Sequence, residues 1–75
     1  MNNQNFDFQT TFKLAIENHK KNNFEEASYL YEKILNVNPN HFDTNFYFGT
    51  LNLQTKNFTK ACKLLGKATE INPNI

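Results

Sequence analysis

The chain repeats itself at a spacing of 34 residues, and this period constrains its fold more than any other feature. Residues 22–27 read NNFEEA and residues 56–61 read KNFTKA, and each stretch is followed by an apolar run and then by Asn-Pro-Asn. When residues 8–41 are aligned with residues 42–75, 12 of the 34 pairs are identical and no insertion is needed. A fixed period of this length is typical of proteins built from stacked repeats.

Within each repeat, apolar residues recur three or four positions apart, which is the spacing of one face of a helix. This pattern predicts helices over residues 8–21, 24–37, 42–55 and 58–71. We therefore expect an all-α fold of four antiparallel helices, with one hairpin over residues 8–41 and another over 42–75, behind a flexible leader of residues 1–7. Leu14 lies off the apolar stripe and predicts a second buried face on the first helix.

Polar residues mark the expected ends of the helices. Asn23 is placed to cap the second helix, with Glu26 three residues later completing a capping box, and Asn57 is placed to cap the fourth helix. Asn40 is placed to open the third helix after Pro39, which the second helix cannot pass. The NNFEEA and KNFTKA stretches are thus expected to be the turns inside the two hairpins.

Asparagine is common, at 14 of 75 residues. It is a poor to middling helix former, so we expect no stabilisation from those inside the predicted helices, at Asn18, Asn45 and Asn52. Coding bias in an AT-rich genome explains this composition more simply than a functional row of Asn side chains.

Composition and motifs argue against several classes of protein. The net charge of +1 is too balanced to favour a nucleic-acid or polybasic membrane partner, and no apolar run approaches the length of a membrane span. The N-terminus does not read as a secretory signal, and a lone cysteine, Cys62, fits a cytoplasmic chain; we expect it to have a packing role. No set of residues has metal-ligand, nucleophile or phosphate-loop spacing, so we expect no catalytic residue, metal or cofactor.

The repeat resembles the tetratricopeptide repeat family, whose unit is a helix–turn–helix of 34 residues. With the first position at Phe8 and Phe42, the matching residues are Leu14, Ala15, Ala27, Tyr31, Ile34 and Pro39 in repeat one and Phe48, Gly49, Ala61, Leu65, Ala68 and Pro73 in repeat two. Thr11 and Asn45 stand where the family prefers Trp, and Asn18 and Asn52 where it prefers Tyr. The resemblance implies two hairpins stacked as a right-handed superhelical fragment.

The resemblance also implies a concave groove lined by the first helix of each hairpin. The corresponding residues here are Gln9, Phe12, Ile16, His19, Lys20, Asp43, Phe46, Thr50, Leu53 and Gln54. Lys13, Lys20 and Tyr47 are expected to add polar contacts at the edge of this groove. Members that bind chaperone tails hold a carboxylate with Lys and Asn where this chain has Phe12 and Ile16, so a chaperone-tail ligand is not expected. Equally, the apolar residues at the centre of the groove could pack against one another, or on Phe6 and Phe8.

A repeat array normally ends with a polar-faced capping helix, and none follows the fourth predicted helix. We therefore expect an uncovered, self-associating face at Leu64, Leu65, Ala68 and Ile71. The function expected first is a non-catalytic scaffold that binds a peptide or protein partner through the groove. The alternatives are the N-terminal repeat segment of a multidomain transferase, and a structural module that assembles with its own copies.

Overall fold

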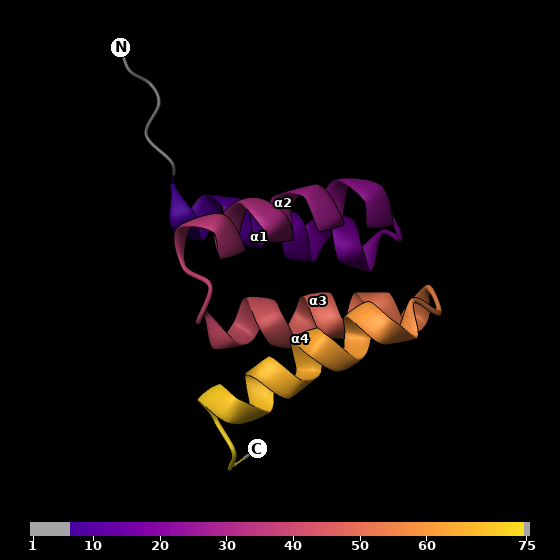
Figure 1. Ribbon diagram of the computed structural model, residues 1–75. Coiled ribbons are helices and arrows are strands. Elements are labelled where there is room, and N and C mark those ends of the chain that lie inside the picture. The colour runs from indigo at the N-terminus through magenta and orange to yellow at the C-terminus, as the bar shows by residue number, and fades with distance from the viewer. Residues whose placement is uncertain (1–6, 75) are drawn as a thin grey trace.

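Four helices form two antiparallel hairpins that stack as two layers (Figure 1). The computed structural model describes residues 7–74, with α1 at Phe8–Lys20, α2 at Phe24–Val37, α3 at Phe42–Gln54 and α4 at Phe58–Ile71. α1 packs on α2 and α3 packs on α4, and α3 also contacts both helices of the first hairpin. The predicted all-α fold is confirmed, since residues 7–74 contain helices and turns but no strand.

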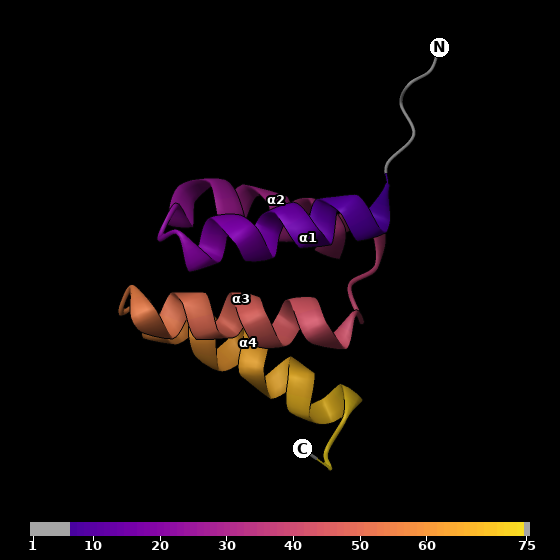
Figure 2. The same ribbon diagram turned by 180° about the vertical axis from the view of Figure 1, so that it is seen from behind.

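The two hairpins present the same helix to the same side. α2 and α4 face the viewer in Figure 1, whereas α1 and α3 face the viewer when the molecule is turned round (Figure 2). The turns inside the hairpins lie at one end of the stack, and the connection from α2 to α3 lies at the other end. The expected groove residues belong to α1 and α3, so the two helices that carry them lie on the same side of the molecule.

The core lies between the first hairpin and α3. Its buried members are Ala15, Ala27, Leu30, Tyr31, Phe48 and Leu51. The rings of Tyr31 and Phe48 pack with their centroids 5.3 Å apart and join the two repeats. Ala27 and its counterpart Ala61 are almost completely buried, as expected where two helices approach closely.

Both hairpin turns end their first helix in the same way. Asn22 and Lys56 have φ of 65°, and their N–H groups donate to the carbonyls of His19 and Leu53. The next residue in each turn, Asn23 or Asn57, donates its N–H to the carbonyl five residues back, at 2.8 Å. This pair of bonds is a Schellman motif, and it ends α1 and α3 one residue earlier than predicted.

The predicted capping box at the start of α2 is wrong. Neither Asn23 nor Asn57 makes a side-chain bond to its own helix, and Asn23 Nδ2 instead donates to Asn18 Oδ1 at 3.2 Å. The backbone N–H of Asn23 donates to the Asn18 carbonyl in the Schellman motif, and the Asn23 side chain bonds to the same residue. Glu26, the expected partner of the box, is exposed.

The first helix of each repeat is capped by the side chain of the residue directly before it. Asp7 caps α1 by accepting from the N–H and hydroxyl of Thr10, at 3.3 and 2.6 Å. His41, not Asn40, caps α3, and its Nδ1 accepts from the N–H and hydroxyl of Thr44 at 3.3 and 2.7 Å. Asp7 therefore belongs to the folded repeat, whereas the rest of the expected leader, like Ile75, lies outside the described residues.

Contrary to expectation, the side chains of the asparagines inside the helices form hydrogen bonds with backbone carbonyls. Asn45 is 2% exposed, and its Nδ2 donates to the carbonyls of Pro39 and His41 at 3.0 and 2.9 Å. Asn52 is 5% exposed and donates to the Phe48 carbonyl, as Asn18 does to the Leu14 carbonyl, both at 2.8 Å. Asn45 thereby ties the α2–α3 connection to the start of α3.

Two expectations about exposed faces are also corrected. Leu14 is 44% exposed and forms no second buried face. On α4, Ala68 is only 1% exposed, and Leu64 and Leu65 are half-buried. A Cβ on Gly49 would lie 2.7 Å from Leu65, so this part of the expected self-association face packs against α3.

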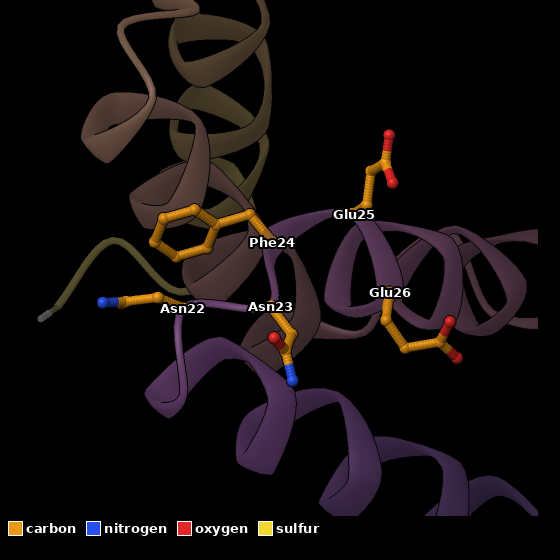
Figure 3. Close-up of a pocket in the computed structure, with 5 residues that line it drawn as sticks. All are labelled: Asn22, Asn23, Phe24, Glu25 and Glu26. Carbon is orange, nitrogen blue, oxygen red and sulfur yellow. The ribbon is translucent and has the colours of Figure 1, made fainter.

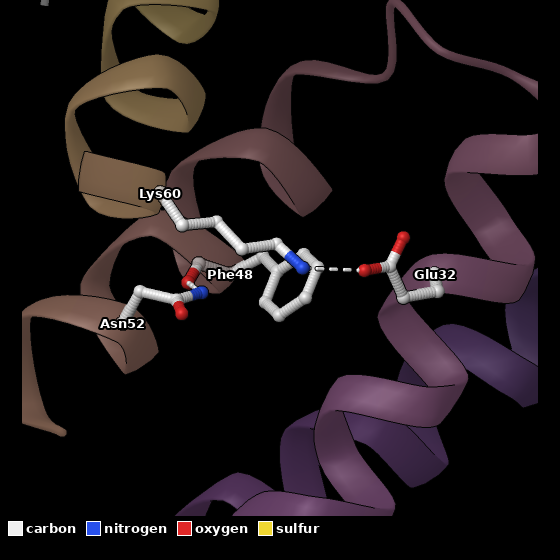
Figure 4. Close-up of polar contacts among 4 residues, drawn as sticks. All are labelled: Glu32, Phe48, Asn52 and Lys60. Atoms are coloured by element: carbon white, nitrogen blue, oxygen red, sulfur yellow. Dashed lines mark hydrogen bonds and ion pairs between the residues drawn. The ribbon is translucent and has the colours of Figure 1, made fainter. Parts of the chain in front are cut away.

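The ion pair between Lys60 and Glu32 links the second hairpin to the first (Figure 4). Lys60 Nζ of α4 lies 2.6 Å from Glu32 Oε2 of α2 and 4.8 Å from the centroid of the Phe48 ring. Both charged side chains are more than 40% exposed, so the pair contributes about 0–1 kcal/mol to stability. The buried Tyr31–Phe48 contact is therefore the stronger link between the repeats.

Candidate functional site

Two hollows lie on the face formed by α1 and α3. The first, which we call the Gln54 hollow, has a volume of about 440 Å³ and is lined by Ile16, His19, Lys20, Asn22, Tyr47, Thr50 and Gln54. The second, which we call the His41 hollow, has a volume of about 300 Å³ and is lined by Phe8, Gln9, Phe12, Lys13, His41 and Asp43. They bring together side chains that lie far apart in the sequence.

A run of aromatic side chains joins these hollows. Phe12 packs against His41 in an edge contact of 5.4 Å and against Tyr47 at 6.0 Å between ring centroids. Tyr47 in turn contacts Phe46 at 5.6 Å. Phe46 and Tyr47 are still 38% and 39% exposed, so these residues pack together without closing the face. The alternative of a self-filled groove is tested only in part, since Phe6, one of its expected members, lies outside the described residues.

His19 links the core to the Gln54 hollow through two hydrogen bonds. Its Nε2 lies 2.6 Å from Gln54 Oε1, and its Nδ1 lies 2.9 Å from the Tyr31 hydroxyl. Because an amide oxygen can only accept, His19 Nε2 carries the proton, and Nδ1 accepts from the Tyr31 O–H. These bonds connect α2, α1 and α3 and hold Gln54 in one orientation.

The Tyr31 hydroxyl is suited to this donor role. Tyr31 is 0% exposed, and burial raises the pKa of its hydroxyl above the ordinary value, with a smaller contribution from Tyr47. The hydroxyl therefore stays protonated and can donate the hydrogen bond to His19 Nδ1. The His19 ring is further enclosed by edge contacts with Phe24 and Tyr31, at 5.8 and 5.9 Å between centroids.

The hollows account for most, but not all, of the expected groove residues. The Gln54 hollow contains Ile16, His19, Lys20, Thr50 and Gln54, and the His41 hollow contains Gln9, Phe12 and Asp43. Phe46 contacts Tyr47, which lines the Gln54 hollow, but Phe46 itself lines neither hollow. Leu53 also lines neither and is 46% exposed.

Three lining residues were missing from the expected set: Phe8, Asn22 and His41. Lys13 and Tyr47 were expected only as polar contacts at the edge of the groove, and each lines one of the hollows. Asn22 and His41 lie in turns, outside any helical period, and only the packing of the two hairpins brings them to the hollows.

A third surface hollow, of about 580 Å³, lies at the turn between α1 and α2. It is lined by the consecutive residues Asn22, Asn23, Phe24, Glu25 and Glu26, whose side chains point in different directions (Figure 3). No second element provides an opposing wall. This hollow is a shallow depression beside a turn, and we do not regard it as a binding site.

Reactive side chains are dispersed over the part of the chain that the structure describes. Within residues 7–74, no three His, Cys, Asp or Glu side chains gather in a way that could hold a metal ion. Cys62 is exposed, so the expected packing role is not supported. None of the helices α1 to α4 is long and apolar enough to cross a membrane.

Comparison with known proteins supports the resemblance seen in the repeat. A family model described as tetratricopeptide repeat matches residues 45–75, which cover nearly all of the second repeat. A search among curated proteins found no significant match. Residues 8–41 repeat the matched segment in phase and fold into the same hairpin. The family match and the four-helix structure together fit a protein built from tetratricopeptide repeats.

Proposed function

We propose that this chain is a non-catalytic binding module that holds a peptide segment of a partner protein along the α1/α3 face. Tetratricopeptide repeats generally mediate protein–protein interaction. The observation that carries the proposal is the pair of hollows on this face, joined by Phe12 and Tyr47 and flanked by the exposed ring of Phe46. Exposed apolar side chains gathered on one face are typical of partner sites.

The face fits an extended or helical peptide that carries apolar side chains. Aromatic rings provide contact area at a low cost in conformational entropy, and the hollows on either side can receive alternate side chains of the ligand. Lys13, Lys20 and Tyr47 supply polar groups at the edges. The ligand is therefore expected to combine apolar anchors with polar contacts.

The test is a selection of phage-displayed random peptides on the immobilised chain of residues 1–75. Affinities of the selected peptides are then measured for the wild type and for Phe46→Ala and Phe58→Ala. Phe58 is the matched control, because it is a Phe on α4 that is 60% exposed and lines none of the hollows described here. We expect Phe46→Ala to weaken binding about tenfold or more, as for the truncation of an aromatic anchor, and Phe58→Ala to leave it within about twofold.

A selection that yields no binding peptide contradicts the proposal. Equal losses for the two Phe variants contradict the assignment of the α1/α3 face. Circular dichroism of each variant checks that the helices are retained.

A second candidate, assembly with copies of the same chain, is favoured by one observation. Phe58 on α4 is 60% exposed, whereas its counterpart Phe24 is half-buried and packs against the core cluster. Light scattering over a range of concentrations tests this candidate. If assembly is the function, the mass rises with concentration, Phe58→Ala abolishes the rise, and Phe12→Ala and Phe46→Ala do not.

A further inference from the structure

We propose that the Gln54 hollow receives the carboxylate of an acidic side chain from the bound peptide. This inference rests on the proposed function and names the chemistry of one contact within it. The hollow is lined by one cation, Lys20, by the amides of Asn22 and Gln54, and by no carboxylate. Its charge and its hydrogen-bond donors are therefore complementary to an anion.

The orientation of Gln54 is the central observation. Its Oε1 is held 2.6 Å from the His19 Nε2–H, and His19 is held by the buried hydroxyl of Tyr31. Because the oxygen of the amide is directed at His19, the amide NH₂, with its two N–H donors, is the group left for a ligand. Both nitrogens of His19 are used in this arrangement, so His19 acts as a positioning residue.

Of the other polar groups of the hollow, Thr50 offers a ligand no donor, because its hydroxyl donates to the Phe46 carbonyl at 2.9 Å. Lys20 is exposed, so its ammonium is hydrated in the free protein and is accessible to a ligand. A carboxylate placed between Lys20 and Gln54 would receive one charge-assisted bond and one amide bond.

The His41 hollow does not offer this preference. It is lined by Lys13 and Asp43, whose charges have opposite signs, and by the rings of Phe8, Phe12 and His41. An anion there would meet Asp43 as well as Lys13. The two hollows therefore differ in ligand chemistry, and the acidic group belongs to the Gln54 hollow.

An Asp or Glu side chain fits better than a chain terminus. Ile16 and the half-exposed ring of Tyr47 line the same hollow as the donors. The methylene stem of an acidic side chain can pack on this apolar wall while its carboxylate reaches Lys20 and Gln54. A terminal carboxylate has no such stem.

The experiment uses peptides from the selection described above, synthesised with amidated C-termini so that no terminal carboxylate is present. Each peptide is compared with a version in which one Asp or Glu is replaced by Asn or Gln. Affinities are measured for the wild type, Lys20→Gln, Gln54→Glu and the control Lys21→Gln. Gln54→Glu is informative because it keeps an acceptor oxygen for His19 and replaces the NH₂ by a charged oxygen. Lys21 is an exposed neighbour of Lys20 that does not line the hollow.

We expect one acidic position at which neutralisation weakens binding to the wild type by about fivefold or more, as for a partly exposed charge-assisted bond. The same neutralisation should have less than about a twofold effect on Lys20→Gln, and Gln54→Glu should bind the neutral peptide better than the acidic one. Lys21→Gln should behave as the wild type.

Three results would overturn the inference while leaving the proposed function standing. The selected peptides could lack acidic residues, neutralisation could weaken binding equally in the wild type and Lys20→Gln, or amidation of the C-terminus alone could abolish binding. If no peptide binds at all, the proposed function and this inference fail together.

Discussion

The two repeats carry similar residues at equivalent positions but bury them to different extents. Position 7 of the repeat is Leu14 in the first copy, where it is 44% exposed, and Phe48 in the second, where it is 1% exposed. At position 17 the first copy is the more buried one: Phe24 is half-buried, whereas Phe58 is 60% exposed. Each repeat therefore buries the surface that faces the other repeat and exposes its opposite surface.

This difference shows that the repeat sequence determines the hairpin, whereas a neighbouring repeat determines the core. Tyr31 and Phe48 are buried because they meet across the junction of the repeats. Leu14 has no such neighbour in the described part of the chain. The stability of the molecule should accordingly depend most on residues at the junction, as expected for stacked repeats.

The largest expected effect is at position 7. Phe48→Ala removes a fully buried ring and should cost about 3–5 kcal/mol of unfolding free energy, whereas Leu14→Ala should cost less than about 1 kcal/mol because Leu14 is half in solvent. Urea unfolding followed by circular dichroism measures both values. Phe48→Leu, which gives repeat two the residue of repeat one, should retain a cooperative transition. Equal costs for the two Ala variants would contradict the comparison.

The second effect is at position 8, which is Ala15 in repeat one and Gly49 in repeat two. A Cβ on Gly49 would lie 2.7 Å from both Cγ and Cδ2 of Leu65. Gly49→Ala should therefore lose about 1–2 kcal/mol, since overpacking outweighs the better helix propensity of Ala. Gly66→Ala is the control, because no neighbouring atom lies within 4 Å of its added Cβ, and it should gain about 1 kcal/mol. Thermal unfolding gives both changes, and a gain for Gly49→Ala would refute the proposed close packing.

The third effect concerns the cap of α3. His41→Ala removes an acceptor for the N–H and hydroxyl of Thr44 and should cost about 1 kcal/mol. His41→Asn should cost less, because Asn is among the best N-cap residues. Unfolding free energies of the two variants are compared. If His41→Asn and His41→Ala destabilise the chain equally, the contacts of the imidazole with Phe8 and Phe12 matter more than the cap.

A smaller effect is expected in the hairpin turns. Asn22 and Lys56 share a left-handed conformation, with φ of 65°, which Asn tolerates better than Lys does. Lys56→Asn should therefore stabilise the chain by about 0.5–1 kcal/mol, and the reciprocal Asn22→Lys should destabilise it by a similar amount. Melting temperatures of both variants test this swap, and changes of the same sign would argue against it.

The smallest expected effect is acid weakening of the α1 cap. The Thr10 hydroxyl, and secondarily the Thr10 N–H, hold the pKa of the Asp7 carboxyl below its ordinary value. A lowered pKa means that the ionised cap stabilises the fold above the ordinary Asp value of about 3.9 and that this contribution is lost as the pH falls through the lowered value. Hydrogen exchange of the Thr10 amide should rise in acid in the wild type relative to Asp7→Asn. An identical pH dependence in both proteins would contradict this role.

Much of the fold was predictable from local sequence. The four helices begin at the expected residues, and Ala27 and Ala61 are buried where close helix packing was expected. The capping box failed because the backbone of Asn23 serves the preceding helix through its bond to Asn18. The Asn side chains within helices were misjudged because propensity describes an exposed helix, whereas Asn45 and Asn52 are buried and bonded to carbonyls.

The candidate site was predictable only in outline. The family resemblance placed Ile16 and His19 of α1 and Thr50 and Gln54 of α3 in one groove, and all four line the Gln54 hollow. The resemblance did not predict the bond between His19 and Gln54, which are 35 residues apart. Nor did it place Asn22 and His41 at the hollows, since both lie in turns.

The sequence by itself therefore determined the 34-residue period, the helices and the family resemblance of this chain, because these depend on residues a few positions apart and on their recurrence. The tertiary structure decided which copy of each position is buried, which residue caps α3 and how Gln54 is oriented. Each of these depends on how the hairpins approach each other, and the distance between residues from different repeats is set by packing and not by their spacing in the chain.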